Sequence, residues 1–337
     1  MGYQRGIVNY IGSKLKLSNF LEESIKKTVG EISDATFCDI FAGTGIVGRR
    51  FKAMAKKVIA NDIEYYSYVL NRNYIGNTRS FEKEPLLDVL NQMEGTKGFI
   101  YQHYSLGGHG DRQYFSDANA MKIDAIRQMM ESWREEGRID EDQYFFLLAS
   151  LIESADKVAN TASVYGAYLK HLKQSAQKPL ILEAAVFDTE GEGHEIYHED
   201  ANSLISRISG DILYMDPPYN QRQYGANYHL LNTIARYDSF TPQGKTGLRE
   251  YVRSDYCKKS VVVESFEELI KNADFNYIFL SYNNEGLMQS QEVEKIMQKY
   301  GRYSLATTQY QRFKADKTEN RNHKATTTTE YLHILEK

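Results

Sequence analysis

Residues 35–48 read ATFCDIFAGTGIVG and join a short apolar run to a glycine-rich turn. The run from Ala35 to Phe41 is rich in strand formers, and apolar residues between Ile46 and Ala55 repeat with helical spacing. A second strand is predicted from Lys57 to Asn61 and a helix from Tyr65 to Tyr74. Strand, glycine turn, helix and strand in this order predict an α/β fold with a doubly wound, mostly parallel sheet.

The middle of the chain has a different pattern from its two ends. Helical periodicity over 117–137 and 140–158 predicts two long helices, with Asp117 and Asp140 as N-caps and Gly137 as a stop. We therefore expect a mainly helical insertion at 77–190, which recognises the target, within a catalytic domain formed by 1–76 and 191–337. Further strands are predicted at 195–198, 211–215, 276–281, 303–310 and 328–335, and helices at 265–273 and 290–300.

The glycine turn predicts a site for a cofactor that contains adenosine. Gly43, Gly45 and Gly48 have the spacing of the dinucleotide fingerprint. Asp62 follows about twenty residues later, where a carboxylate binds ribose hydroxyls. NAD and S-adenosylmethionine both fit these features, and a tight turn without a ligand is the structural alternative. Asp39, near the end of the first strand, would repel a pyrophosphate and attract the ammonium of a methionine moiety, which favours S-adenosylmethionine.

A second motif, Asp216-Pro217-Pro218-Tyr219, follows the predicted strand 211–215. The two prolines remove two backbone donors and stiffen the chain, so the turn offers only acceptors, the Asp216 carboxylate and the Pro217 carbonyl. Two acceptors that bind the hydrogens of an aromatic amino group return its lone pair to the nitrogen for attack on a methyl group. Tyr219 supplies a flat face for the heterocycle. An ordinary turn that contains Pro-Pro is the structural alternative.

With these motifs in order, the sequence resembles the Dam-like class of DNA adenine-N6 methyltransferases over nearly its whole length. Residues 9–14, NYIGSK, are similar to the N-terminal cofactor motif of that class, although Ser13 stands where many members have glycine. The resemblance implies that S-adenosylmethionine is bound by Tyr10, Lys14, Asp39, Phe41, Gly43, Gly45, Asp62, Asp200 and Asp216. It implies that the catalytic residues are Asp216, Pro217, Pro218 and Tyr219.

The resemblance also implies a substrate and a biological setting. The target adenine would be flipped out of duplex DNA to reach Asp216, at a cost of a few kcal/mol. The stretch Arg222-Gln223-Tyr224 is similar to methylases that accompany type IIS restriction systems, which implies a separately encoded cognate endonuclease. We expect a monomer that a bacterium, an archaeon or a phage encodes.

Two basic segments with interleaved aromatic residues, 245–259 and 302–324, are typical of phosphate contact and base stacking, or of solvated loops. We expect DNA contacts from Asn220, Arg222, Tyr224, Lys258, Lys259, Arg312 and Lys314, and His229 is a further candidate. The segment 158–170 is interpreted as a DNA-facing loop, and an irregular packing segment is the alternative. Arg127, Arg134 and Arg138 are accompanied by glutamates, which predicts a solvated helix face.

Two other patterns carry weaker hypotheses. Residues 194–198, HEIYH, spell a zinc-protease motif that requires a helix, but the segment is predicted to be a strand, so we expect no metal site. Cys38 and Cys257 are too few for a disulfide framework and are predicted to be inert thiols.

Composition sets wider limits. The net charge of -4 gives no global attraction to nucleic acid, and the first nine residues do not resemble a signal peptide. No apolar run is long enough to cross a membrane, and two cysteines suit a reducing compartment, so a cytoplasmic protein is expected.

Three alternative functions stay open at this point. The chemistry of the tetrad Asp216-Pro217-Pro218-Tyr219 would also serve a methyltransferase that acts on an RNA base or on a glutamine side chain. The glycine turn would serve an NAD-dependent oxidoreductase. A catalytically idle DNA-binding module is the third alternative.

Overall fold

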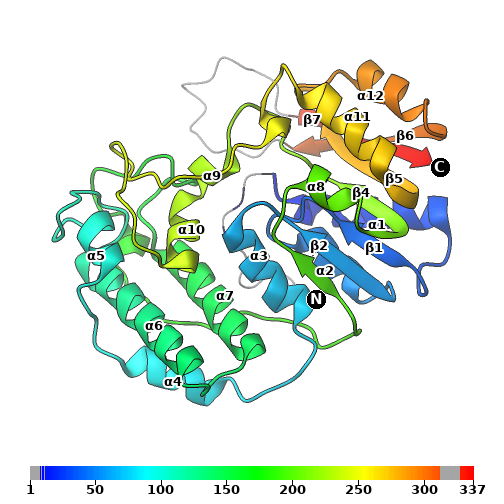
Figure 1. Cartoon of the computed structure of the whole chain (residues 1–337). Coiled ribbons are helices and arrows are strands. Elements are labelled where there is room, and N and C mark those ends of the chain that lie inside the picture. The colour runs from blue at the N-terminus through cyan, green and yellow to red at the C-terminus, as the bar shows by residue number, and fades with distance from the viewer. Residues whose placement is uncertain (1–7, 9, 11, 312–326) are drawn as a thin grey trace. The chain divides into compact units, whose positions relative to one another are not determined.

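The computed structural model describes residues 8, 10, 12–311 and 327–337, and the chain divides into two units (Figure 1). The sheet unit consists of Gly12–Ile63, Glu190–Gln223 and Val252–Lys337. The helical unit consists of Met1–Ile11, Glu64–Thr189 and Tyr224–Tyr251. The helical unit therefore includes more of the chain than the insertion expected at 77–190.

The described part of the sheet unit forms one seven-stranded sheet in the order β3-β2-β1-β4-β5-β7-β6. Strands β1 to β5 pair in parallel, and β7 pairs antiparallel with both β5 and β6. The predicted fold class is thereby confirmed. The strands are β1 (Thr36–Asp39), β2 (Lys57–Asn61), β3 (Glu195–Tyr197), β4 (Ser209–Met215), β5 (Asp274–Asn283), β6 (Arg302–Gln311) and β7 (Thr327–Glu336).

The buried strands explain why the sheet is mostly parallel. The final residues of β4, Ile212 to Met215, are all fully buried, as expected for a strand covered on both faces.

β1 ends at Asp39, two residues before the predicted end, because the chain turns away there. The backbone still hydrogen-bonds to its neighbours beyond that point, since the Ile40 amide donates to the Tyr214 carbonyl.

Helices cover both faces of this sheet (Figure 1). On one face, the ring of Phe51 in α2 stacks on Phe37 of β1 with 4.0 Å between their centroids. Helix α1 is joined to α2 by the ion pair between Glu22 and Arg50. On the other face lie α8, α11 and α12. These elements are η1 (Lys14–Leu17), α1 (Ser18–Val29), α2 (Ile46–Lys52), α8 (Ala201–Ile205), η4 (Asp255–Cys257), α11 (Val262–Asn272) and α12 (Ser290–Met297).

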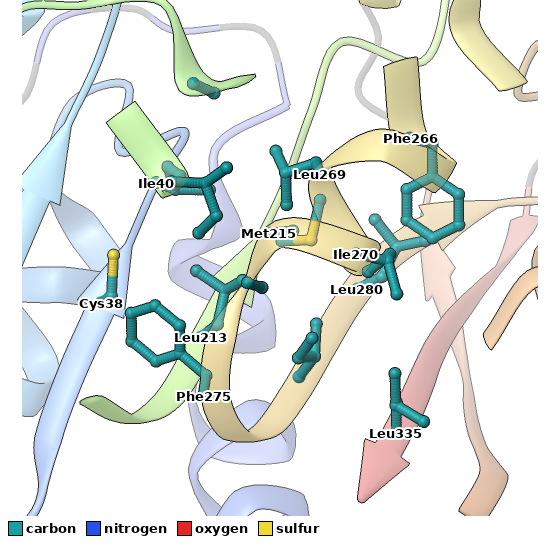
Figure 2. Close-up of a cluster of buried hydrophobic side chains, with 14 of the residues drawn as sticks. Cys38, Ile40, Leu213, Met215, Phe266, Leu269, Ile270, Phe275, Leu280 and Leu335 are labelled. Atoms are coloured by element: carbon teal, nitrogen blue, oxygen red, sulfur yellow. The ribbon is translucent and has the colours of Figure 1, made fainter. Parts of the chain in front are cut away.

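The core of the sheet unit lies between the sheet and α8, α11 and α12. Figure 2 shows side chains of β1, β4 and β5 in contact with those of α11, among them Leu213, Leu269 and Ile270. Leu213, Phe266 and Ile270 are completely inaccessible to solvent. Burial of a side chain of this size stabilises the fold by about 1.5–3 kcal/mol.

The helical unit is built around α6 and α7, the two long helices predicted from periodicity. Its elements are α3 (Tyr65–Asn71), the π-helical turn η2 (Arg72–Gly76), α4 (Glu84–Gln92), α5 (Phe99–Tyr104), α6 (Asp117–Glu135), α7 (Glu141–Val158), η3 (Gln174–Gln177), α9 (Tyr224–Asn227) and α10 (His229–Arg236). Asp140 caps α7 in a capping box, and Gly137 has a φ of 68°, so both predictions are confirmed. The prediction for Asp117 is wrong, because Ser116 caps α6 and Asp117 instead accepts from the Gly107 amide.

Two further expectations in the helical unit need correction. Arg127 is only 1% exposed, donates to the Ile234 carbonyl and pairs with Glu131, so it does not belong to a solvated face. Within the segment 158–170, Asn160 and Tyr165 are fully buried and hydrogen-bonded, which favours the packing interpretation for this part. No helix in the described ranges has both the length and the apolar composition required to cross a bilayer.

We expect Leu213→Ala to lower the free energy of unfolding by about 2–5 kcal/mol, because it leaves a cavity in the core of the sheet unit. Leu305→Ala, which shortens a side chain that is 43% exposed on β6, is the matched control and should change stability by less than about 0.5 kcal/mol. Urea unfolding followed by circular dichroism measures both values, and equal losses would contradict this account of the core.

Candidate active site at the carboxyl edge of the sheet

The glycine loop between β1 and α2 has a backbone that only glycine adopts readily. Gly43 and Gly45 have φ values of 52° and 77°, in the left-handed region where a Cβ atom causes strain. Gly45 is also the N-cap residue of α2. The loop therefore presents bare backbone beside the end of β1.

Two carboxylates hold this loop. The Gly43 amide donates to Oδ2 of Asp62 at 2.7 Å, and the Gly48 amide donates to Oδ2 of Asp39 at 3.2 Å. Asp39 is 1% exposed, and its Oδ1 atom has no hydrogen-bond partner among the described residues. A buried carboxylate oxygen without a donor is costly unless a ligand supplies the donor.

The loop is also held by Asn61, the last residue of β2. Its side-chain amide donates to the carbonyls of Ile40 and Glu199 and accepts from the Glu199 amide. These bonds tie together the ends of β1, β2 and β3. No sequence motif singled out Asn61, and its only signal was a polar residue at the end of an apolar strand.

The Asp216–Tyr219 tetrad begins directly after β4. Because β4 pairs in parallel with β1 and β5, Asp216 follows its strand at the same edge of the sheet as the glycine loop. The Tyr219 carbonyl accepts from the Leu287 amide at 3.1 Å, which fixes the end of the tetrad to the segment after β5.

Lys14 joins the tetrad to the last strand of the chain. Its ammonium lies 3.1 Å from Oδ1 of Asp216 and 2.6 Å from Oε1 of Glu330. The side chains of Lys14 and Glu330 are 8% and 5% exposed, whereas that of Asp216 is 21% exposed. Glu330 is a residue that the sequence analysis missed, since a single acid at the start of a strand gives no motif.

The pKa values follow from burial and from these charges. Burial raises the pKa of Asp216 to about 6, the Lys14 ammonium opposes the rise and the Glu330 charge adds to it. Burial also raises the pKa of Asp39, and the charge of Asp216 raises it further. For Lys14, burial disfavours the ammonium, but the charges of Asp216 and Glu330 outweigh it and raise the pKa above its usual value.

Two other residues expected at the cofactor have clear structural roles. The ring of Phe41 makes an edge contact with the buried Tyr256, with 4.8 Å between centroids. Asp200 is exposed and caps α8 through a hydrogen bond from the Ser203 amide to its Oδ1 atom. That cap accounts for the position of Asp200 without a ligand.

The expected DNA contacts in the sheet unit lie in exposed segments. Asn220 accepts from the Arg222 amide, which forms the turn after the tetrad, and Arg222 itself is exposed. Lys258 and Lys259 are exposed after η4, and Lys258 pairs with Asp255 at 2.7 Å. Arg312 and Lys314 lie outside the described residues.

Other predicted residues belong to the helical unit. The ring of Tyr10 stacks on Tyr228 with 5.0 Å between centroids and is tilted against Tyr224 at 5.4 Å. His229 is completely buried in α10 with Nε2 3.0 Å from the Tyr165 carbonyl, so the expectation that it meets a flipped nucleotide is wrong.

The HEIYH segment is the strand β3, as predicted, and not a helix. His194 accepts from the Val58 amide, and His198 lies 3.0 Å from the Ile63 carbonyl. In the ranges that the structure covers, no three potential ligands gather around a metal position. Both cysteines are buried, and burial raises the pKa of Cys38 well above its usual value, which disfavours a reactive thiolate there.

The site fits S-adenosylmethionine better than a dinucleotide. The buried Asp39 oxygen without a donor suits the ammonium of a methionine moiety, and the crowding of Asp39 with Asp216 and Asp62 would repel a pyrophosphate. Gly43 and Gly45 have no Cβ atom that would hold a ligand away from the loop backbone.

Comparison with known proteins agrees with this geometry. The family model of D12 class N6 adenine-specific DNA methyltransferases matches residues 10–297. The type II methyltransferase M.NlaIII of Neisseria lactamica is 66% identical over 98% of this chain and 99% of its own length. The type II methyltransferase M.CviAII of Paramecium bursaria Chlorella virus 1 is 38% identical, over 91% of this chain and 93% of its own length.

The type II methyltransferase M.FokI of Planomicrobium okeanokoites is also 38% identical, over 98% of this chain but 53% of its own length. The family predicted from the order of the motifs is confirmed by these matches. The chain belongs to the D12 class of N6 adenine-specific DNA methyltransferases.

Proposed function

We propose that Asp216 and the Pro217 carbonyl activate adenine N6 in the reaction of this family, in which S-adenosylmethionine donates a methyl group to adenine in DNA. The observation that carries this assignment is the Asp216 carboxylate, whose side chain is 21% exposed, on a turn whose next two residues have no backbone donor. When bound, the cofactor supplies a methyl group on a positively charged sulfur.

The chain contributes acceptors and a stacking surface. The Asp216 carboxylate and the Pro217 carbonyl each accept a hydrogen bond from the amino group. The lone pair of the nitrogen is then concentrated on that atom. This arrangement is complete only in the transition state, so it lowers the barrier to transfer. Tyr219 offers its ring to the flipped base, a contact worth about 1–3 kcal/mol.

We assign the cofactor to the glycine loop and its two carboxylates. Asp39 binds the methionine ammonium through its buried Oδ1 atom, and Asp62 holds both the loop and the ribose. Lys14 connects this region to the tetrad through Asp216. Asp200 stays a predicted contact to the adenine moiety of the cofactor, and Phe41 and Tyr10 stay predicted cofactor contacts.

The substrate that we propose is duplex DNA with the target adenine flipped out. The half-buried Asn220 and the exposed Arg222, Lys258 and Lys259 supply polar and cationic contacts to phosphates, and Tyr224 adds an aromatic ring in the helical unit. The helical unit reads the recognition sequence. A cognate restriction endonuclease, encoded separately, is the proposed biological partner, because three relatives are type II methyltransferases.

We expect Asp216→Asn to reduce the single-turnover methylation rate on duplex DNA by roughly 10²- to 10³-fold, because a charged acceptor is lost in the transition state. DNA affinity, measured by gel shift, should stay near the wild-type value. Asp274→Asn, at the exposed start of β5, is the control and should methylate normally. Equal losses of binding and turnover in Asp216→Asn, or methylation of RNA alone by the wild type, would contradict the proposal.

The wild-type rate should also depend on pH through Asp216. Since the pKa of Asp216 is raised to about 6, the carboxylate is ionised above that pH and becomes protonated below it. We therefore expect the single-turnover rate to be constant near neutral pH and to fall tenfold per unit well below pH 6. A rate that is independent of pH down to about 5 would exclude Asp216 as the ionised acceptor.

For the cofactor, we expect Asp39→Asn to weaken S-adenosylmethionine binding by about 10- to 100-fold, as for the loss of a charge-assisted hydrogen bond. Asp34→Asn removes an exposed carboxylate from the turn before β1 and is the matched control. Isothermal titration calorimetry measures both, and unchanged affinity of Asp39→Asn would place the ammonium elsewhere.

A further inference from the structure

The antiparallel direction of β7 brings its beginning to the edge where the parallel strands end. Glu330 pairs in register with Asn283, the last residue of β5. A parallel strand in the same place would put its first residues at the opposite edge. Glu330 therefore lies on the catalytic side of the sheet, although it belongs to the final strand of the chain.

The Lys14 ammonium is shared unequally between two carboxylates. Its distance to Glu330 is 2.6 Å and its distance to Asp216 is 3.1 Å, and Glu330 is the more buried of the two acids. An ammonium that donates mainly to Glu330 neutralises Asp216 only partly. Breaking a buried pair of this kind is costly, so Glu330 restrains the position of Lys14.

The charged and titratable groups around Asp216 come from four elements. Lys14 of η1 is the cation. The charge of Glu330 in β7 raises the pKa of Asp216, and the charge of Asp216 raises the pKa of Asp39 in β1. Tyr214 of β4 also feels the charge of Asp216, and its phenol donates to the Ser281 hydroxyl at 2.8 Å. Of these groups, Glu330 acts on Asp216 directly and also through Lys14.

We propose that Glu330 is a positioning residue that holds the Lys14 ammonium and draws it partly away from Asp216. The Asp216 carboxylate then stays available to the hydrogens of the adenine amino group and does not form a closed ion pair with Lys14. This inference rests on the proposed role of Asp216 as the acceptor. The raised pKa of Asp216, to which burial and Glu330 contribute while Lys14 opposes them, agrees with it.

The test is the pH profile of the single-turnover methylation rate of the full chain, with duplex DNA and S-adenosylmethionine at saturation. Glu330→Gln keeps an acceptor for Lys14 but removes the charge. We expect the midpoint of the acid limb to move down by about one pH unit, because Lys14 then acts on Asp216 alone. The plateau rate should fall about tenfold, since a tighter ion pair competes with the amino group.

Two further variants test whether the midpoint of the acid limb moves in directions that a merely structural role of Glu330 would not produce. Lys14→Gln should move the midpoint upward, because the only cation identified beside Asp216 among the described residues is removed. Glu336→Gln alters the same kind of residue at the other end of β7, 3.9 Å from Arg302, and should leave the profile unchanged. Identical midpoints for Glu330→Gln and Glu336→Gln, or an upward move in Glu330→Gln, would overturn the proposal.

If Glu330→Gln does not fold, Glu330→Asp keeps the charge but shortens the side chain, so the Lys14 ammonium is held less closely and moves toward Asp216. Its midpoint should lie below that of the wild type, and an unchanged or higher midpoint would overturn the proposal. A failure of the underlying assignment has a different signature. In that case the wild type would lack an acid limb, or Asp216→Asn would retain its rate.

Discussion

Repulsion between carboxylates at the carboxyl edge of the sheet is the constraint on which the site depends. Asp39 and Asp216 lie close enough for each to affect the ionisation of its neighbours, and both are removed from bulk water. Such a group of acids is stable only if cations or hydrogen-bond donors compensate it. The Gly48 amide at Asp39 and the Lys14 ammonium at Asp216 provide part of this compensation, and the Gly43 amide does the same for the neighbouring Asp62. A positively charged cofactor would provide more of it.

Much of the fold could be predicted from local patterns. Alternation and apolar runs located all seven strands in the described sheet to within three residues at each end, and Asp140 was correctly predicted as the N-cap of α7. Errors arose where distant contacts override local preference. Arg127 looked like part of a charged helix surface but is buried against carbonyls of α10, and the sequence alone does not show which helix face is covered.

The candidate site was predicted where a motif is continuous in the chain. The glycine loop and the tetrad are short segments whose chemistry can be read from neighbouring residues. Glu330 could not be found in this way, since 316 positions separate it from Lys14 and only strand order brings the two together. Asp200 shows a different limit of prediction from sequence. It stands at the place that the motif order predicts for a cofactor-binding acid, but it also caps α8, and the sequence does not distinguish these two roles.

The strand order has a consequence for the synthesis of this protein. β7 lies between β5 and β6, so the described residues of β6 pair only with a strand that is translated after them. While the ribosome is still making β7, β5 has an open side and β6 has no partner strand among the described residues. Closure of that side and arrival of the carboxylate that binds Lys14 are the same event. A nascent chain therefore completes the ion pair between Lys14 and Glu330 only after β7 has left the ribosome and can fold.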